Sequence, residues 1–419
     1  MSDVENKIKE HFKVLVPKLM SYLRDDYYKY EYELERPNDS IFFSGTFYMR
    51  IKFWINDNND VKDKNKTNKN KEKIIIMRLV AKTPITTEAV QQLMKANDQF
   101  YNEIIFYRNY ATEGDNIPKC YYTNENDLFG ATLVLEDITT KGYKIHPKKV
   151  DIPLDDILPV MKEIARFHAK GYVMKEKHPE KFVGFIETIK ECRYDANDND
   201  PNSHYVYLLN HVTCRPINYL RKINYDNNFC DKLEECLKNA YRKILLKTIE
   251  PVEPLAVLCH GDLTINNMLF KRDEKDTRVM LIDFALIRYG SPAIDLSTFL
   301  CLSCSNQVKC ENLPIVLRTY HDELTRCLKE NGLTNLEKYS FEAFWNDYVE
   351  HALFGYTVCS YFLHTLMNED LPPLPDILDK KMEDLANIVI ESGGDKITIA
   401  LANILIDLKE LGCFNKILS

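Results

Sequence analysis

At 419 residues, the chain is longer than one hydrophobic core usually serves, so two domains or lobes are expected. Hydrophobic residues make up 45% of it and charged residues 28%, which is typical of a globular protein in water. The formal net charge of -8 argues against nucleic acid or an anionic membrane as the main partner, and no apolar run approaches the roughly 18 residues of a membrane-spanning helix.

The first part of the chain is predicted to hold one helix and one pair of strands. Apolar residues recur at helical spacing up to about residue 32, namely Ile8, Phe12, Leu15, Leu19 and Leu23. Residues 41–48 and 49–54 are predicted to form paired strands around a small-residue turn. Residues 56–73 are nearly all polar and include six lysines. That composition allows anion binding, but it favours a disordered, solvated insertion.

Three further elements complete the first third. Residues 73–82 form a strongly β-prone run that Thr83 and Pro84 close. A long helix is expected over 87–110, and a hydrophobic strand over 131–135 runs directly into Glu136 and Asp137. This part of the chain is therefore predicted to be rich in strands, with one long helix.

The remainder is predicted to be mostly helical. A helix is expected over 157–168, a buried strand over 279–282 ends at Asp283, and residues from 315 onward are helical apart from a proline-rich break at 371–375. We therefore predict an α+β, two-lobed fold, with a strand-rich N-terminal lobe (1–138) and a helical C-terminal lobe (139–419).

Twelve cysteines are scattered among apolar segments, and the N-terminal residues carry no apolar signal region. Reduced thiols that serve as small core residues are the expected use, in a cytoplasmic protein. The cluster of Cys301, Cys304 and Cys310 is the one group that invites a test for zinc, but it has no fourth ligand at convincing spacing.

The most informative residues are Asp262, Asn267 and Asp283. Asp262 lies in His260-Gly261-Asp262, Asn267 follows five residues later, and Asp283 ends the strand that comes next. Phosphoryl transfer from ATP with magnesium needs a carboxylate that orients the attacking hydroxyl, and oxygen ligands that hold the metal. Asp262 is the predicted catalytic residue, and Asn267 and Asp283 are the predicted metal ligands. A His-Gly-Asp tripeptide alone is usually a plain turn, but the full spacing makes coincidence improbable.

Lys82 and Glu103 are predicted to help bind ATP. Lys82 ends a buried strand, where its ammonium could reach the phosphates, and Glu103 lies on the following helix, where it could hold that lysine in an ion pair. Without the downstream motif, the simpler interpretation would be a strand-end lysine in water and a surface glutamate. Arg78, on the same strand face, is a weaker candidate.

Four further residues are candidates for support or for contact with the base. Backbone groups at Glu136 and Ile138 could pair with an adenine edge, although side chains there could simply cap the next element. His260 and Asp295 are supporting candidates. The sequence leaves open whether Asp295 caps its helix or forms a bond to the catalytic loop. His168 is expected to be a core histidine with hydrogen-bond partners rather than a reactive group.

These motifs resemble the insect ecdysteroid kinase-like family, also called CHK kinase-like, a relative of choline and aminoglycoside kinases. The resemblance is carried by residues 258–270 and 282–296, with weaker similarity at 100–107, 133–137 and 165–168. It implies a two-lobed, protein-kinase-like fold in which the C-terminal lobe carries the catalytic loop and the acceptor site. It also implies ATP with magnesium, and transfer of the γ-phosphate to a hydroxyl of a small molecule such as an ecdysteroid or a xenobiotic. Two departures are Ala285, where the family commonly has glutamine, and a phosphate-covering turn whose one glycine is Gly45.

Other classes of function remain for comparison. A protein kinase is disfavoured because Asp283 and Asp295 are too close in sequence to enclose a peptide-binding activation segment. A catalytically weak or inactive nucleotide-binding scaffold is the alternative, which retention of Lys82, Asp262, Asn267 and Asp283 argues against. The C-terminal part is rich in aromatic residues, which could line an acceptor site and would then favour a flat apolar acceptor. Their helical spacing favours a role in the core instead. They are Phe341, Phe344, Trp345, Tyr348, Phe354, Tyr356, Tyr361 and Phe362. Oligomeric state cannot be deduced from the sequence.

Overall fold

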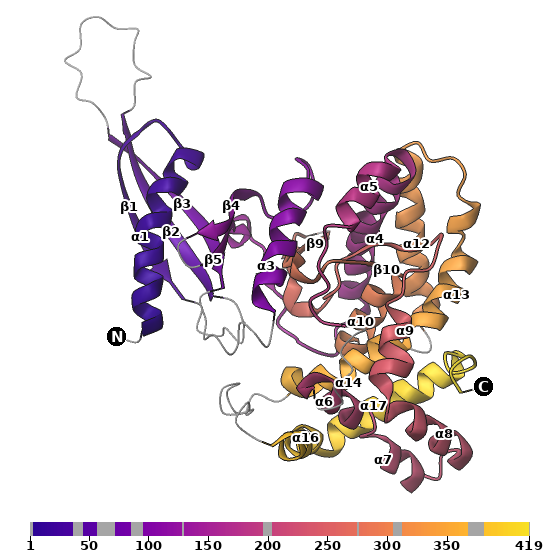
Figure 1. The fold of residues 1–419 in the computed structure, drawn as a ribbon. Helices are drawn as coiled ribbons and strands as arrows, with labels where there is room; N and C mark the ends of the chain where they lie inside the picture. Colours follow the sequence, from indigo (N-terminus) through magenta and orange to yellow (C-terminus); the bar gives the residue numbers. More distant parts are fainter. Residues whose placement is uncertain are drawn as a thin grey trace, which may run out of the picture. The chain divides into compact units, whose positions relative to one another are not determined.

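The computed structural model describes residues 3–36, 45–56, 72–84, 95–127, 130–195, 203–274, 276–304, 312–367 and 381–418 (Figure 1). The chain divides into two compact units. The first unit comprises Met1–Lys144, Lys190–Arg193 and Ile282–Leu286, and the second comprises Ile145–Ile189, Tyr194–Leu281 and Ile287–Ser419. The lobe boundary after residue 138 stays a prediction. Within the described residues, no helix is both long and apolar enough to cross a membrane.

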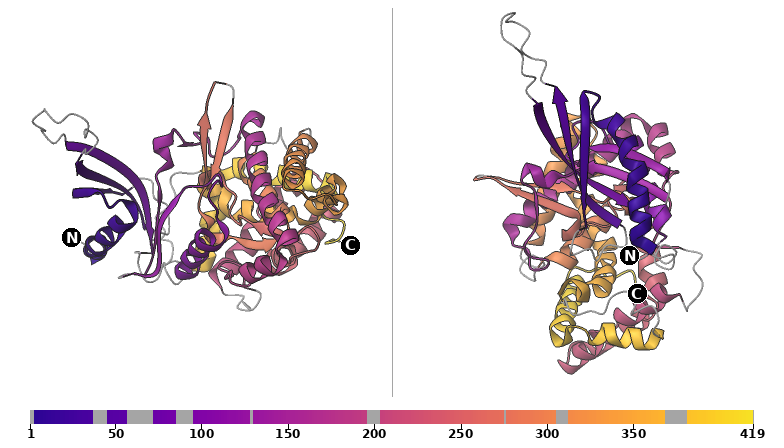
Figure 2. Two further views of the ribbon diagram at one scale, coloured as in Figure 1. Left: turned by 90° about the horizontal axis from the view of Figure 1, so that it is seen from above. Right: turned by 90° about the vertical axis from the view of Figure 1, so that its left-hand side faces the viewer.

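The first unit is built on an antiparallel sheet whose strands have the order β1-β2-β3-β5-β4. Their bounds are β1 (Tyr27–Glu35), β2 (Gly45–Asn56), β3 (Glu72–Thr83), β4 (Cys120–Asp127) and β5 (Gly130–Glu136). Alternate side chains of β2 are buried, from Phe47 to Phe53, because successive residues of a strand point to opposite faces. Helix α1 (Asp3–Leu23) lies against this face of the sheet (Figure 2). There Phe12 contacts Phe47, with ring centroids 5.1 Å apart.

Two of the predicted elements in this unit are wrong. The first helix ends at Leu23 rather than near residue 32, and β1 follows it. Residues 27–35 alternate tyrosine or leucine with charged residues, which is a strand pattern that the helical periodicity of the preceding segment obscured. The predicted pairing of residues 41–48 with 49–54 is also wrong, since residues 45–54 belong to one continuous strand, β2, which pairs with β1 and β3. Residues 41–44 and 57–71 lie outside the described residues.

The helix expected over 87–110 is seen from Ala96 onward, as α3 (Ala96–Ile105) followed by a π-helical turn, η1 (Phe106–Tyr110). Residues 87–94 of that prediction lie outside the described residues. A 3-10 turn, η2 (Ile138–Lys141), follows β5, and another, η5 (Phe284–Leu286), belongs to the first unit although it comes late in the chain. The predicted strands over 73–82 and 131–135 are present as β3 and β5.

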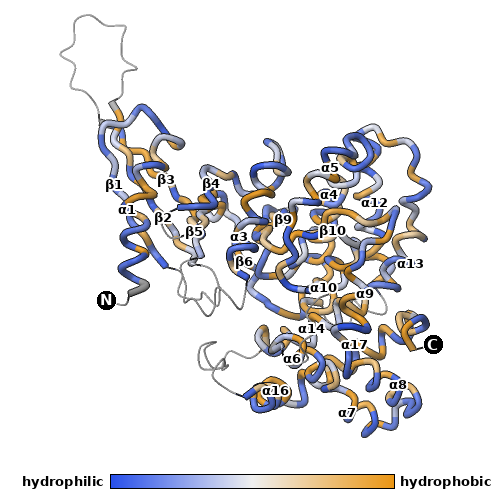
Figure 3. The backbone as a smooth tube through the Cα atoms, in the orientation of Figure 1, coloured by the Kyte–Doolittle hydropathy of each residue, from blue (hydrophilic) through white to orange (hydrophobic). Residues whose placement is uncertain are grey.

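The second unit is mostly helical, with short strands that carry the central motifs. Its helices are α4 (Leu154–Lys177), α5 (Pro179–Ile186), α6 (His204–Val212), α7 (Ile217–Lys222), α8 (Asn227–Leu237), η3 (Tyr241–Leu245), α9 (Leu246–Thr248), η4 (Ile265–Asn267), α10 (Ala293–Ser303), α12 (Leu313–Glu330), η6 (Glu337–Tyr339), α13 (Phe341–His351), α14 (Leu353–Met367), α16 (Met382–Glu391) and α17 (Gly394–Glu410). Its strands form the sheets β10-β7 and β6-β8-β9, with β6 (Lys144–Ile145), β7 (Val257–Cys259), β8 (Met268–Arg272), β9 (Thr277–Leu281) and β10 (Arg288–Gly290). Hydrophobic segments occur in the sheet of the first unit and throughout these helices (Figure 3).

Helix α10 is the centre of the second unit, since every residue from Ala293 to Ser303 is buried. Helix α14 packs closely against it at Gly355, where an added Cβ would lie 2.3 Å from the carbonyl oxygen of Ser297. Only a residue without a side chain fits this approach of the two backbones. This packing fixes the position of α10, the helix that carries the predicted site residue Asp295.

We expect Gly355→Ala to lower the free energy of unfolding by about 3 kcal/mol, because backbone atoms must move to admit the methyl group. Chemical denaturation checks this. The matched control is Gly184→Ala on α5, where an added Cβ meets nothing within 4 Å. That change should be neutral or stabilising by roughly 0.5–1 kcal/mol through a better helix propensity. Equal effects of the two substitutions would contradict the packing argument.

Candidate active site

The first unit brings together three of the predicted site residues, Lys82, Glu103 and Asp283. Lys82 stands at the end of β3, and its Nζ lies 2.8 Å and 2.7 Å from the two carboxylate oxygens of Glu103 on α3. The same Nζ lies 3.2 Å from Oδ1 of Asp283. Lys82 is 8% exposed and Glu103 is 1% exposed. The result is one buried ammonium held by the buried carboxylate of Glu103 and by the partly exposed carboxylate of Asp283.

Burial and charge act in opposite directions on this cluster. Burial alone would lower the pKa of Lys82, but the carboxylates of Asp283 and Glu103 outweigh it and raise the pKa above the usual lysine range. Burial raises the pKa of Glu103 to about 7, against the lowering effect of Lys82. Lys82 is therefore a permanent cation over any working pH.

Asp283 has an unusual backbone conformation for a residue with a side chain. Its φ is 67°, in the left-handed region that costs free energy for residues other than glycine. The next residue, Phe284, is fully buried and stacks on Phe106 with ring centroids 3.9 Å apart and an interplanar angle of 14°. This stacking fixes the segment that follows Asp283, so its carboxylate is presented toward Lys82 by a constrained turn.

The second unit holds the His260-to-Asn267 loop, which runs from β7 to β8. The side-chain nitrogen of Asn267 donates hydrogen bonds to the backbone oxygen and to Oδ2 of Asp262, both over 2.9 Å. Gly261 has a φ of 78°, which lets the chain turn sharply just before Asp262. Asp262 and Asn267, predicted from their spacing alone, are thus in direct contact.

Asp295 holds the backbone of this loop by hydrogen bonds. Its Oδ2 accepts from the backbone N–H of His260 over 2.7 Å, and its Oδ1 accepts from that of Gly261 over 2.8 Å. Burial favours the neutral acid, but the hydrogen bond from His168 and the nearby amides outweigh burial and lower the pKa of Asp295. Of the two interpretations left open by the sequence, the structure has the bond to the loop.

His168 lies in the core and both of its ring nitrogens have partners. One contacts the hydroxyl of Tyr320 at 2.9 Å and the other Oδ2 of Asp295 at 3.1 Å. Cys259 lies close to His168 and Asp295, but its Sγ contacts the carbonyl oxygen of Ser291 at 3.2 Å and burial raises its pKa, both of which are features of a neutral thiol. These residues form a hydrogen-bonded support rather than a metal site.

The segment after β5 has a more specific geometry than the sequence indicated. The N–H of Glu136 donates to the backbone oxygen of Lys119 over 2.8 Å, and its side chain pairs with Lys141. Arg78 binds the carboxylate of Asp137 at 3.0 Å instead of extending toward a ligand. An adenine contact here would therefore use the carbonyl of Glu136 and the backbone of Ile138, which is itself buried.

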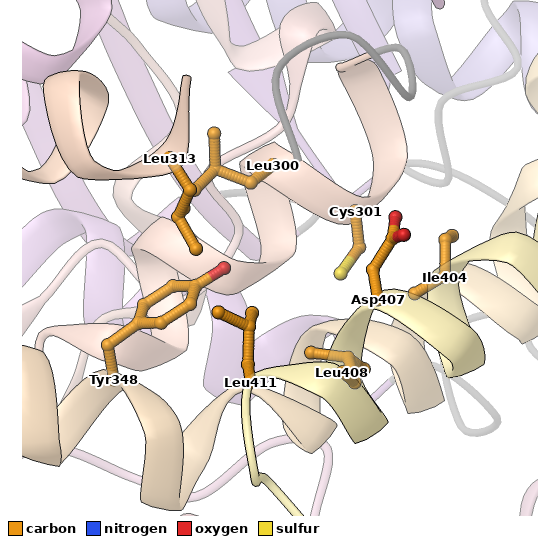
Figure 4. Close-up of a pocket in the computed structure, with 8 residues that line it drawn as sticks. All are labelled: Leu300, Cys301, Leu313, Tyr348, Ile404, Asp407, Leu408 and Leu411. Atoms are coloured by element: carbon orange, nitrogen blue, oxygen red, sulfur yellow. The ribbon is translucent and has the colours of Figure 1, made fainter. Parts of the chain in front are cut away.

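Half of the aromatic residues considered for the acceptor pocket belong to the core. Phe344, Tyr348, Phe354 and Tyr356 are at most 6% exposed. A nearby cavity among α10, α12, α13 and α17 has a volume of about 20 Å³, which suits about one water molecule (Figure 4). Its lining residues are Leu300, Cys301, Leu313, Tyr348, Ile404, Asp407, Leu408 and Leu411. It is too small to admit a substrate.

Sequence reasoning missed several residues that position the site. Tyr320 is 152 residues from its partner His168, and Asn102 contacts Lys190 across 88 residues. No local pattern marks such pairs. Phe106 could have been found from the sequence. It lies three positions after Glu103, so the two side chains share one face of the predicted helix.

The comparisons with known proteins come from a family model, from curated sequences and from solved structures. The model of the ecdysteroid kinase-like family matches residues 45–333, more than half of the chain. The chain belongs to the ecdysteroid kinase-like family. The resemblance noted from its motifs and the predicted α+β, protein-kinase-like fold are thereby confirmed, and family membership makes it a small-molecule phosphotransferase with a hydroxyl acceptor. No curated protein matches it in sequence.

Several solved structures are similar to this family member at low identity. An aminoglycoside 2'-phosphotransferase mutant in complex with GDP is 12% identical, with 95% of this chain and 98% of that chain covered and a TM-score of 0.42. The Plasmodium vivax ethanolamine kinase is 12% identical, with 90% and 81% covered and a TM-score of 0.39. A microcompartment-associated aminopropanol kinase is 11% identical, with 91% and 95% covered and a TM-score of 0.35. All three scores lie below 0.5, so the family assignment does not depend on them.

Proposed function

We propose that this member of the ecdysteroid kinase-like family is an active, ATP-dependent kinase that phosphorylates a hydroxyl of a small, apolar acceptor such as an ecdysteroid or a xenobiotic. The observation that carries the proposal is the cluster of buried Lys82 and buried Glu103 with the partly exposed Asp283. A buried cation beside two carboxylates is costly to maintain, and it suits an ATP-binding site in which the lysine engages phosphate oxygens.

In this proposal, Lys82 binds the phosphates and Glu103 holds its ammonium in place. Asp262 orients the attacking hydroxyl and accepts its proton as the bond from that oxygen to the γ-phosphorus forms and the bond to the β,γ-bridging oxygen breaks, which releases ADP. The bond from Asn267 keeps the Asp262 carboxylate in one orientation. His260 and Asp295 keep the loop backbone in place, and the backbone of Glu136 and Ile138 contacts the base.

Asn267 and Asp283 are proposed to hold magnesium, and their chemistry fits that ion. The amide of Asn267 uses its nitrogen on Asp262, so its oxygen is the end that remains for a metal. Asp283 contributes a carboxylate, one oxygen of which contacts Lys82. Amide and carboxylate oxygens are the hard donors that Mg²⁺ prefers. When bound, the ion neutralises the negative charge on the phosphates.

The apolar acceptor is proposed from the family and from the remaining aromatic residues. Four members of the predicted set, Phe341, Trp345, Tyr361 and Phe362, are only partly buried. Such side chains offer flat apolar surface, which suits a steroid or a phenolic compound better than a highly charged sugar. The cytoplasmic location stays a prediction.

Transfer of labelled γ-phosphate from ATP in the presence of magnesium tests the proposal. The acceptors would be ecdysteroids, other sterols, plant phenolics, glycosides and choline, and Asp262→Asn would be the control. We expect a labelled product with an apolar hydroxyl compound and none with the control variant. A product with choline or glycosides alone would overturn the acceptor class. Binding of ATP that does not depend on magnesium, with no transfer to any acceptor or to water, would favour the inactive scaffold.

A further inference from the structure

Asn102 is a fully buried amide that lies beside Glu103 on α3. Its side-chain oxygen accepts a hydrogen bond from the backbone N–H of Lys190 over 2.9 Å. Its side-chain nitrogen donates to the backbone oxygen of the same residue over 2.8 Å. A buried amide costs free energy unless such bonds are made, and this two-way pairing also fixes which end of the amide points where.

The nitrogen of Asn102 reaches a second segment as well. It lies 3.3 Å from the backbone oxygen of Ala285, two residues after Asp283. The same nitrogen is 3.3 Å from Sγ of Cys192. One side chain thus joins α3, the segment Lys190–Arg193 and the segment Ile282–Leu286, all of which belong to the first unit.

Three further contacts hold the same segments against α3 and the turn that follows it. The Nζ of Lys190 binds Oδ1 of Asp98 at 2.7 Å and lies 4.5 Å from the ring centre of Tyr101. Farther along the helix, Phe106 stacks on Phe284. The ion pair is more than a third exposed on both sides, so it contributes little, whereas the bonds of Asn102 are shielded from water.

Asn102 lies close in sequence or by contact to both of the acids that bind Lys82. Glu103 is the next residue on the helix, and Asp283 is two residues before the carbonyl that Asn102 binds. We propose that Asn102 is a positioning residue that sets the separation of Glu103 and Asp283 around Lys82, an inference that rests on the proposed kinase function. The segment Lys190–Arg193 is the anchor against which this amide is oriented.

The substitution Asn102→Asp tests the proposal with almost no change in volume. The acceptor for the Lys190 N–H is retained, but the second oxygen then faces the carbonyl oxygens of Lys190 and Ala285 in place of a donor. We expect kcat for phosphoryl transfer, or for hydrolysis of ATP by water, to fall about 10- to 100-fold, because small displacements at a reacting centre have effects of this size. The magnesium concentration for half-maximal rate should rise, since Asp283 moves.

A second pair of variants keeps the test decisive if Asn102→Asp does not fold. Lys190→Pro removes both the lysine side chain and the backbone N–H that donates to Asn102. Lys190→Ala removes the side chain alone. We expect a loss of rate and a higher magnesium requirement in Lys190→Pro, and values within about twofold of the unsubstituted protein in Lys190→Ala. If the buried amide served stability alone, loss of its pairing would lower the melting temperature and leave the magnesium requirement of the folded enzyme unchanged. That result would overturn the proposal.

Hydrogen exchange separates failure of this inference from failure of the proposed function. In a folded variant that lacks either half of the pairing, amides of both Ala96–Ile105 and Ile282–Leu286 should exchange faster than in the unsubstituted protein. If the unsubstituted protein transfers no phosphate to any acceptor or to water, the kinase function fails, and exchange alone decides the role of Asn102. Unchanged exchange over residues 282–286 would overturn it.

Discussion

Asp262→Asn should lower kcat for phosphoryl transfer by at least about 100-fold, because an amide cannot accept the proton of the attacking hydroxyl. The amide oxygen of the new asparagine can still accept the hydrogen bond that Asn267 donates to Oδ2 of Asp262. The loop should therefore keep its shape, and the affinity for ATP with magnesium should change less than about threefold. Steady-state kinetics and calorimetric titration of the nucleotide measure the two quantities separately.

A matched control for this prediction is Asp273→Asn, which removes the same charge from an exposed residue of the hairpin between β8 and β9. That variant should retain the activity of the unsubstituted protein within about twofold. A rate for Asp262→Asn close to that of the control would remove Asp262 from the mechanism. An equal loss of rate and of nucleotide affinity would instead assign it to ATP binding.

Lys82→Met should have the second large effect, on both stability and nucleotide binding. It leaves Glu103 buried at 1% exposure without the ammonium that its carboxylate contacts, and it removes the same cation from Asp283. Removing one partner of a buried ion pair costs about 3–5 kcal/mol of folding free energy. We expect a loss of this size in urea denaturation at pH 8, together with a large loss of affinity for ATP.

The stability loss of Lys82→Met should depend on pH in a definite direction. Burial raises the pKa of Glu103 to about 7 from an ordinary value of 4.5, so the folded protein binds this proton more tightly than the unfolded chain does. A raised carboxyl pKa gives stability that is present at low pH and is lost as the pH rises through that pKa. Lys82 opposes the shift, so its removal raises the pKa further, and the deficit should shrink between pH 8 and pH 5.

The double substitution of Lys82→Met with Glu103→Leu separates folding from function. It removes the stranded carboxylate, so most of the lost stability should return, as expected when a buried ion pair is replaced by apolar side chains. Nucleotide affinity should not return, because no cation remains at the end of β3. A double variant that regained affinity would show that Lys82 does not bind phosphate.

The residues of the site with a strong local pattern could be predicted from the sequence. Asp262, Asn267 and Asp283 were identified by spacing and by the strand before Asp283, and Lys82 with Glu103 by the strand and helix that carry them. In the structure Asn267 donates a hydrogen bond to Asp262, a contact that the spacing alone did not predict. Their catalytic roles remain proposals that the substitutions above would test.

Other features depended on tertiary contacts that no local pattern encodes. The helix prediction continued into β1 because tyrosines suit either structure, and pairing with β2 decides the outcome. The choice between cap and support for Asp295 required the loop of His260 to be placed next to α10. Asn102 gave no signal, since its partners are 88 and 183 residues away.

The discontinuity of the first unit has a consequence for the order in which the protein can mature during synthesis. Asp283, Phe284 and the carbonyl of Ala285 come from residues 282–286, which are translated long after the sheet and α3. A nascent chain of 144 residues would contain Lys82 and Glu103 but neither the second carboxylate nor the ring that stacks on Phe106. The first unit is therefore completed only after most of the chain has left the ribosome, and a fragment cut at its first boundary would not be a self-sufficient module.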